Sequence, residues 1–281
     1  MSEKLGNRRV TGTEQYYTPH DLALELTESL LERIESPLDR SFLEPAGGTG
    51  SFLNALKSLG ITNYEAVDLH PKHEEVKKQN FLDFKTNKKN LITISNPPFG
   101  RNNALSIPFF NHAAQFSDVI AFLVPRSWRK WSVQNRLDQN FQLIHDQDVD
   151  VDYVREDGSP FGEKNELRTC FQIWEKRDSK RGKVKIQNQD LIEKSSPESA
   201  DFAIRVFGYG CGKILKNFPK EKNTTLMFLR VLDKRVWDHI EGLDYERFSN
   251  NTAFTKALSF PEINFLLNEQ IFGDGYLELE S

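Results

Sequence analysis

Four consecutive residues, Asn96-Pro97-Pro98-Phe99, combine an amide, two rigid prolines and an aromatic ring. The prolines restrict the backbone, so the side-chain oxygen of Asn96 and the carbonyl of Pro97 can point at one place. Two converging acceptors suit an NH2 group, because they orient it and draw its lone pair away from the ring that carries it. We expect Phe99 to stack on that ring. The motif favours chemistry on the amino group of a flat substrate; the alternative is a structural Asn-Pro turn with a core phenylalanine.

A second candidate site is the glycine-rich run Glu44-Pro45-Ala46-Gly47-Gly48-Thr49-Gly50. Glycines let a backbone approach a ligand closely, although a plain strand-to-helix turn has the same composition. The run lacks the Gly-Lys-Ser/Thr ending that binds a triphosphate. Glu44 disfavours an anionic ligand and favours a positively charged one, such as a sulfonium or an α-amine. Asp68 follows at about the spacing at which an acid accepts both hydroxyl protons of a ribose.

These motifs lie on a pattern of alternating strands and helices. Helices are expected at residues 22–34, 51–59, 106–116 and 132–141, and strands at residues 41–45, 64–68, 76–81, 91–95 and 118–125. Such alternation predicts a parallel, doubly wound sheet. Two further strand-like runs, residues 147–154 and 169–175, have no helix between them, so we expect an antiparallel hairpin at the sheet edge.

The composition excludes several kinds of site and of protein. The chain has 281 residues and two cysteines, which exclude a disulfide framework and a zinc site of paired thiolates, and no other metal site is expected. It lacks the apolar run of a signal peptide or a membrane span, so we expect a soluble, cytoplasmic protein without a membrane partner.

Charge is unevenly distributed along the chain. The net charge is −4, yet residues 176–222 hold twelve lysines and arginines against six acids, a local charge of +6. This charged, turn-prone stretch marks the expected boundary between a catalytic domain, residues 1–176, and a small C-terminal α+β domain, residues 177–281. The local charge suits contact with nucleic acid, and a partner protein is the alternative.

Taken in order, these motifs resemble those of the amino-group DNA methyltransferases that use S-adenosylmethionine, in the group whose cofactor half precedes the catalytic motif. Tyr16-Tyr17-Thr18-Pro19 is similar to the family's N-terminal cofactor motif. Residues 44–50 resemble its glycine loop. Asn80 stands where the family usually has an aspartate that binds the adenine amine, and Asp83 is a rival for that role. The resemblance covers residues 16–176.

The resemblance implies a class I methyltransferase fold, Rossmann-like, with a seven-stranded mixed sheet. It implies S-adenosylmethionine as cofactor, catalysis by Asn96, Pro97, Pro98 and Phe99, and an extruded base stacked between Phe99 and Phe161. It assigns cofactor binding to one set of residues: Tyr17, Thr18, Pro19, Glu44, Pro45, Ala46, Gly48, Gly50, Asp68 and Asn80.

The activity implied is site-specific methylation of adenine N6 in DNA. Adenine N6 in RNA and cytosine N4 in DNA are alternatives that the same motif serves, and a protein glutamine amide is a more distant one. Because the C-terminal domain is small, either the recognised sequence is short or a partner protein recognises it. A relic that only binds cofactor or DNA is disfavoured, because the Asn, both prolines and the ring are all present.

Overall fold

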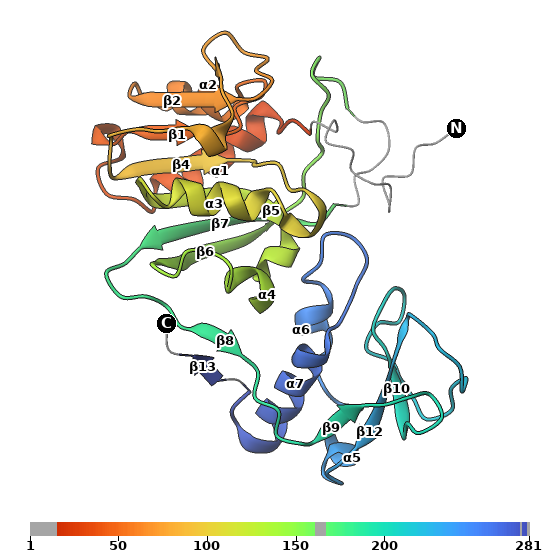
Figure 1. Cartoon of the computed structure of the whole chain (residues 1–281). Coiled ribbons are helices and arrows are strands. Elements are labelled where there is room, and N and C mark those ends of the chain that lie inside the picture. Colours follow the sequence, from red (N-terminus) through yellow and green to blue (C-terminus); the bar gives the residue numbers. More distant parts are fainter. Residues whose placement is uncertain (1–15, 161–166, 276, 280–281) are drawn as a thin grey trace. The chain divides into compact units, whose positions relative to one another are not determined.

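The computed structural model describes residues 16–160, 167–275 and 277–279. The described residues form two compact units, one made of those up to residue 126 and from 132 to 181, and the other of residues 127–131 and those from 182 onward (Figure 1). Within the described residues, no helix is both long enough and apolar enough to cross a membrane.

A seven-stranded sheet forms the centre of the first unit, with the strand order β3-β2-β1-β4-β5-β7-β6. Its strands are β1 (Phe42–Glu44), β2 (Tyr64–Asp68), β3 (Lys77–Lys78), β4 (Leu91–Ser95), β5 (Ser117–Pro125), β6 (Phe141–Val149) and β7 (Thr169–Lys176). Strands β1 to β5 are parallel, whereas β7 is antiparallel to both β5 and β6. The expected doubly wound mixed sheet with an antiparallel edge hairpin is therefore confirmed.

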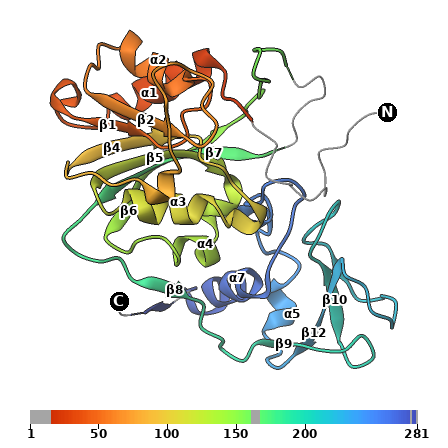
Figure 2. The same ribbon diagram turned by 45° about the horizontal axis from the view of Figure 1, so that its top comes forward.

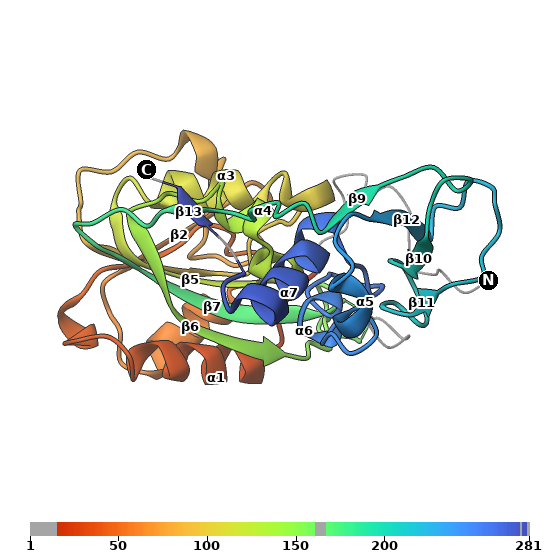
Figure 3. The ribbon, with the colours of Figure 1, turned by 90° about the horizontal axis from the view of Figure 1, so that it is seen from below.

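Helices cover both faces of this sheet. They are α1 (His20–Leu31), α2 (Ser51–Ser58) and α3 (Ser106–Ala113), with single 3₁₀ turns at Pro37–Asp39, Phe81–Asp83 and Arg101–Asn103. A fourth 3₁₀ turn, Arg126–Arg129, and the short helix α4 (Trp131–Gln134) each include residues of both units. Figure 3 shows α1 on one face of the sheet and α3 on the other. Both faces of the central strands are therefore covered, which is why β4 is buried along its whole length.

Aromatic side chains fill much of the core of this unit. The Phe110 ring on α3 is fully buried and makes edge contacts with Phe122, Phe141 and Trp174, at centroid separations of 6.1, 5.5 and 5.7 Å. These three partners come from β5, β6 and β7, so one helical residue packs against three strands. Part of the chain's high phenylalanine content is thus used in the core.

The helix expected at residues 132–141 is wrong. The helix α4 ends at Gln134, and β6 already begins at Phe141. The cause is a local turn, in which the Asp138 carboxylate accepts a hydrogen bond from the Asn140 amide at 2.8 Å and the Asp138 carbonyl accepts one from Phe141. Short polar side chains that bond to nearby backbone in this way compete with helix formation.

Two expected strands also differ from the structure. The strand expected at residues 147–154 lies earlier, as β6, and only Val154 beyond it makes isolated bridges, to Tyr17 and Pro160. The weak strand expected at residues 76–81 shrinks to β3, because Asn80 begins a 3₁₀ turn by accepting a hydrogen bond from the Leu82 amide. Local capping overrides the apolar pattern in this segment.

The second unit is built on a four-stranded sheet of order β11-β10-β12-β9. Its elements are β8 (Lys183–Lys185), β9 (Ile192–Lys194), β10 (Phe202–Arg205), β11 (Ile214–Leu215), β12 (Leu226–Val231), α5 (Val236–His239), α6 (Glu246–Ser249), α7 (Phe260–Phe272) and β13 (Leu277–Leu279). Strand β8 pairs with β13. Figure 2 shows α5 beside β9 and β12, and Val236 of α5 and the following Ile240 share a buried cluster with residues of these strands. The unit has the α+β character expected of the C-terminal part.

A short earlier segment, Ser127–Trp131, also belongs to the second unit. The Trp131 ring packs against the rings of Phe248 and Phe265, each at a centroid separation of 5.2 Å. Lys130 pairs at 2.7 Å with the buried carboxylate of Glu262, which also caps the start of α7. An ion pair shielded in this way stabilises only while both partners are present.

We expect the substitution Phe110→Ala to lower the free energy of unfolding by about 3–5 kcal/mol, because it removes a fully buried ring between three strands. Urea denaturation followed by circular dichroism measures this change. Leu38→Ala is the matched control, since Leu38 is 64% exposed and its truncation leaves no cavity. A loss below about 1 kcal/mol at Phe110 would contradict this account of the core.

Candidate functional site

The glycine loop connects β1 to α2, and at two of its positions glycine is required both by the backbone conformation and by a close neighbour. Gly48 and Gly50 have positive φ angles of 45° and 82°. A Cβ atom on Gly48 would lie 2.9 Å from the Tyr17 ring, and one on Gly50 would lie 2.5 Å from the ring of His73. The Tyr17 and His73 rings therefore pack directly against the loop backbone at these glycines.

Glu44, the last residue of β1, places a carboxyl group beneath this loop. Its side chain is 2% exposed, and Oε1 accepts hydrogen bonds from the Ala46 amide at 2.9 Å and from the Ser95 hydroxyl at 2.5 Å. Burial raises the pKa of Glu44 to about 8. No described residue donates a hydrogen bond to Oε2 of Glu44. That oxygen can therefore bind a positively charged group, which would stabilise the ionised carboxylate.

Asp68, at the end of β2, fixes the position of the loop. Its Oδ2 atom accepts a hydrogen bond from the Gly48 amide at 2.9 Å, and its Oδ1 atom accepts one from the His70 amide at 2.7 Å. Each oxygen keeps a further lone pair, so the carboxylate can accept additional donors. Asp68 does not line the pocket described below.

The segment after Asp68 folds over the glycine loop. The Lys72 amide donates to the Gly48 carbonyl at 2.9 Å, and the side chains of His73 and Val76 lie against Gly50 and Gly47. Sequence reasoning missed this contact, because no motif or spacing marks residues 69–76. The sequence signal is limited to Gly47 and Gly50, because a side chain at either position would meet Val76 or His73.

The N-terminal motif is fixed at three points. Tyr17 exchanges two backbone hydrogen bonds with Val154, at 3.2 and 3.0 Å, and the Thr18 carbonyl accepts a bond from the Ser51 hydroxyl at 2.7 Å. Burial, followed by the charges of Glu156 and Asp68, raises the pKa of Tyr17 to about 12. The Tyr17 ring therefore lies over the loop in its neutral form.

Asn96 follows β4, and hydrogen bonds fix which way its amide points. Its Nδ2 atom donates to the Thr18 hydroxyl at 3.2 Å and to the Tyr16 carbonyl at 3.4 Å. A carbonyl only accepts, so the amide nitrogen must face Tyr16 and the oxygen must face away from it. Oδ1 is buried and accepts no well-formed hydrogen bond from a described residue, although the buried Tyr153 hydroxyl, which also lacks a well-formed hydrogen bond, lies beside the Asn96 amide. A buried acceptor without a well-formed hydrogen bond is costly unless a ligand satisfies it.

The rest of the Asn-Pro-Pro-Phe motif forms a tight turn. Pro97 is buried, Pro98 is exposed and Phe99 is half-buried. The Phe99 carbonyl accepts hydrogen bonds from the amides of Leu105 and Ser106, at 3.2 and 3.4 Å. These bonds hold the turn against the start of α3.

Not every residue that the resemblance assigns lies near these groups. Asn80 is exposed and caps its own 3₁₀ turn, while its Nδ2 atom donates to Asp83 at 2.9 Å. Pro19 stands at the N-cap of α1, and Pro45 is buried within the loop, between Glu44 and Ala46. Phe161 lies outside the described residues.

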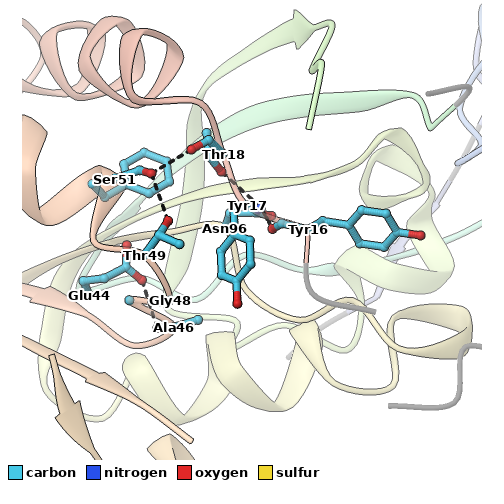
Figure 4. A pocket seen from close by; sticks show the side chains of 11 residues that line it. Tyr16, Tyr17, Thr18, Glu44, Ala46, Gly48, Thr49, Ser51 and Asn96 are labelled. Atoms are coloured by element: carbon cyan, nitrogen blue, oxygen red, sulfur yellow. Dashed lines mark hydrogen bonds between the residues drawn. The ribbon is translucent and has the colours of Figure 1, made fainter. Parts of the chain in front are cut away.

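A single pocket joins the two motifs (Figure 4). Its lining residues are Tyr16, Tyr17, Thr18, Glu44, Ala46, Gly47, Gly48, Thr49, Ser51, Phe52 and Asn96. Six of these come from the residues singled out in the sequence: Tyr17, Thr18, Glu44, Ala46, Gly48 and Asn96. Others, such as Ser51 and Phe52, were missed, although their place at the start of a helix after a glycine loop is a usable signal. The carboxyl group of Glu44 and the Asn96 amide, whose oxygen accepts no well-formed hydrogen bond from the described residues, thus line one pocket.

The described residues contain no group of three or more His, Cys, Asp or Glu side chains that could hold a metal ion.

No protein-family model matches the sequence, and no curated protein is similar to it. Among solved structures, a proposed RNA methyltransferase from Pyrococcus horikoshii is 20% identical, with a TM-score of 0.47 over 61% of this chain and 91% of that one. A proposed class I S-adenosylmethionine-dependent methyltransferase from Listeria monocytogenes is 19% identical, with a TM-score of 0.45 over 62% of this chain and 64% of that one. The modification subunit of a proposed type I restriction enzyme from Vibrio vulnificus is 15% identical, with a TM-score of 0.41 over 63% and 48%. At these TM-scores the likeness says nothing about a shared activity.

The raised pKa of Glu44 predicts a pH-dependent stability difference between the wild type and Glu44→Gln. Because the folded-state pKa of Glu44 lies above the ordinary glutamate value of 4.5, the stability it contributes is present at low pH and is lost as the pH rises toward about 8. The glutamine stays neutral and its oxygen can accept the same two hydrogen bonds. We therefore expect the melting temperature of the wild type to fall by several degrees relative to that of the variant between about pH 5 and pH 8.5.

Differential scanning calorimetry at a series of pH values checks this difference. All other titrating groups are common to both proteins, so Glu44 alone should set it. Parallel curves for the two proteins would show that Glu44 is ionised throughout and that the account of its burial is wrong.

Proposed function

We propose that this protein is an S-adenosylmethionine-dependent methyltransferase that modifies the N6 amino group of adenine in DNA. The observation that carries the proposal is the buried Oδ1 atom of Asn96, which accepts no well-formed hydrogen bond from the described residues, on a residue that lines the same pocket as Glu44 and the glycine loop. An acceptor held in this way is suited to an NH2 donor.

The residues present fit the cofactor. Oε2 of Glu44 can accept a hydrogen bond from an ammonium group, and the glycine loop exposes backbone to the pocket. The neutral Tyr17 ring covers the loop and can exclude water from it. When bound, S-adenosylmethionine supplies an electrophilic methyl group on a positively charged sulfur.

The Asn-Pro-Pro-Phe motif would handle the target amine. Oδ1 of Asn96 and the carbonyl of Pro97 accept its two N–H groups, which holds the amine in one orientation and localises its lone pair on nitrogen. The half-buried Phe99 ring can stack on the base, an interaction worth about 1–3 kcal/mol. No strong base is needed, because the amine proton becomes acidic only after alkylation and can then pass to water.

An adenine reaches such a pocket only when it leaves the base stack, which costs a few kcal/mol. Stacking on Phe99, and on Phe161 as the resemblance implies, would offset this cost. The local charge of +6 over residues 176–222 supports a polyanionic substrate. A partner protein that reads the target sequence completes the proposal, since the C-terminal unit is small.

We expect Asn96→Ala to lower methyl transfer by about 100-fold or more, because it removes the acceptor that orients the amine. Affinity for S-adenosylmethionine, measured by calorimetry, should change by less than about threefold, since Glu44 and the loop remain. Asn87→Ala is the matched control, an exposed asparagine in a loop away from the pocket. Methyl transfer by the Asn96 variant at the wild-type rate would refute the assignment.

The decisive experiment is transfer of radiolabelled methyl from the cofactor to DNA, RNA and protein in parallel. Nuclease digestion and chromatography then identify the modified base. N6-methyladenine in DNA is the expected product. Label in RNA, in cytosine or in protein would keep the cofactor assignment and replace the substrate, whereas label in none of them would overturn the proposal.

A further inference from the structure

The second unit exposes three aromatic rings at one end of its sheet. Phe207 and Tyr209, in the turn from β10 to β11, are 46% and 101% exposed, and Phe254 is 40% exposed. Backbone hydrogen bonds join this turn to the segment that carries Phe254, from Gly208 to the Lys256 carbonyl and from Leu258 to the Val206 carbonyl, each at 3.0 Å. We refer to Phe207, Tyr209 and Phe254 as the aromatic edge.

The turn that carries Tyr209 has a defined shape. Gly208, Gly210 and Gly212 all have positive φ angles, and a Cβ atom on Gly212 would lie 2.8 Å from Cβ of Tyr245. The Gly212 amide donates to the Arg205 carbonyl at 2.7 Å, and further hydrogen bonds within the turn close it. The ordered backbone thus presents Tyr209 to solvent, so little backbone entropy would be lost when its ring binds a ligand.

Two cations flank the turn of the aromatic edge. Arg205 is the last residue of β10, and Lys213 directly precedes β11. Arg205 and Lys213, on either side of the turn, make no ion pair with any described carboxylate, whereas Lys216 and Arg230 do. Rings interleaved with unpaired cations are the combination that binds bases and phosphates together.

We propose that the aromatic edge binds an unpaired stretch of nucleic acid, with bases stacked on Tyr209 and its neighbours and phosphates at Arg205 and Lys213. This inference rests on the proposed function, because it takes the substrate to be nucleic acid. A duplex presents only base edges and phosphates, so the ring faces of the aromatic edge would be unused on fully paired DNA. A strand opened around an extruded base supplies unstacked neighbours for these rings.

The test uses the full-length protein and a fluorescein-labelled oligothymidylate, with binding followed by fluorescence anisotropy. We expect Tyr209→Ala to weaken binding by about fivefold or more, and Tyr209→Phe to bind nearly as well as the wild type because the ring remains. Lys213→Ala should reduce the slope of log affinity against log salt by about 0.7 between 50 and 200 mM, as expected for one lost phosphate contact.

Leu232→Ala is the matched control, since Leu232 is also 46% exposed but follows the opposite end of β12. Its affinity should equal that of the wild type. The inference is overturned if Tyr209→Ala binds like the wild type, if a duplex of equal length binds as tightly as the single strand, or if the wild type binds neither. The last result would leave a protein partner as the occupant of this surface.

Failure of this inference can be told from failure of the proposed function. Asn96→Ala should bind the oligonucleotide like the wild type while losing methyl transfer. Oligonucleotide binding that depends on Tyr209, without methyl transfer to any substrate, would retain the binding surface and reject the enzyme. If Tyr209→Ala methylates nucleic acid and binds the oligonucleotide as well as the wild type does, the proposed enzyme activity is retained and the binding surface is rejected.

Discussion

One buried carboxylate oxygen holds the two motifs of the site together. Oε1 of Glu44 accepts a hydrogen bond from Ala46 in the glycine loop and another from Ser95, the residue before Asn96. Strands β1 and β4 are neighbours and parallel, so their carboxyl ends meet at one edge of the sheet. This contact fixes the spacing between the glycine loop and Asn96 at the cost of burying an ionisable group, and that burial is the cause of the raised pKa of Glu44.

The orientation of Asn96 depends in turn on a segment far away in the sequence. Thr18 and the Tyr16 carbonyl accept both hydrogen bonds of its amide nitrogen, and that segment is itself held by Ser51 and Val154. The site is therefore assembled from the N-terminal segment, the loop after β1, the end of β4 and the residues beyond β6. A disturbance at any of these places would reach the Asn96 oxygen through a short chain of hydrogen bonds.

Much of this arrangement could be predicted from the sequence, because its signals are local. The buried strands are continuous apolar runs, such as residues 91–95, and the loop glycines at 48 and 50 mark backbone that a side chain would block. The packing of His73 on Gly50 could not be predicted, since it depends on a tertiary contact without a spacing rule. The helix expected at residues 132–141 failed because a turn at Asp138 outweighs apolar periodicity. The roles assigned to Asn80 and Phe161 stay predictions.

The second unit is not a separable tail of the polypeptide. Five of its residues, Ser127–Trp131, lie in the sequence between β5 and β6, two strands of the first unit. Trp131 packs against Phe248 and Phe265, and Lys130 neutralises the buried Glu262. If the chain ended at residue 181, Trp131 would lose both of its aromatic partners and Lys130 would lose its counter-ion. In evolutionary terms, the two units could not be exchanged by a single fusion point, and substitutions in either must accommodate the shared five-residue insertion.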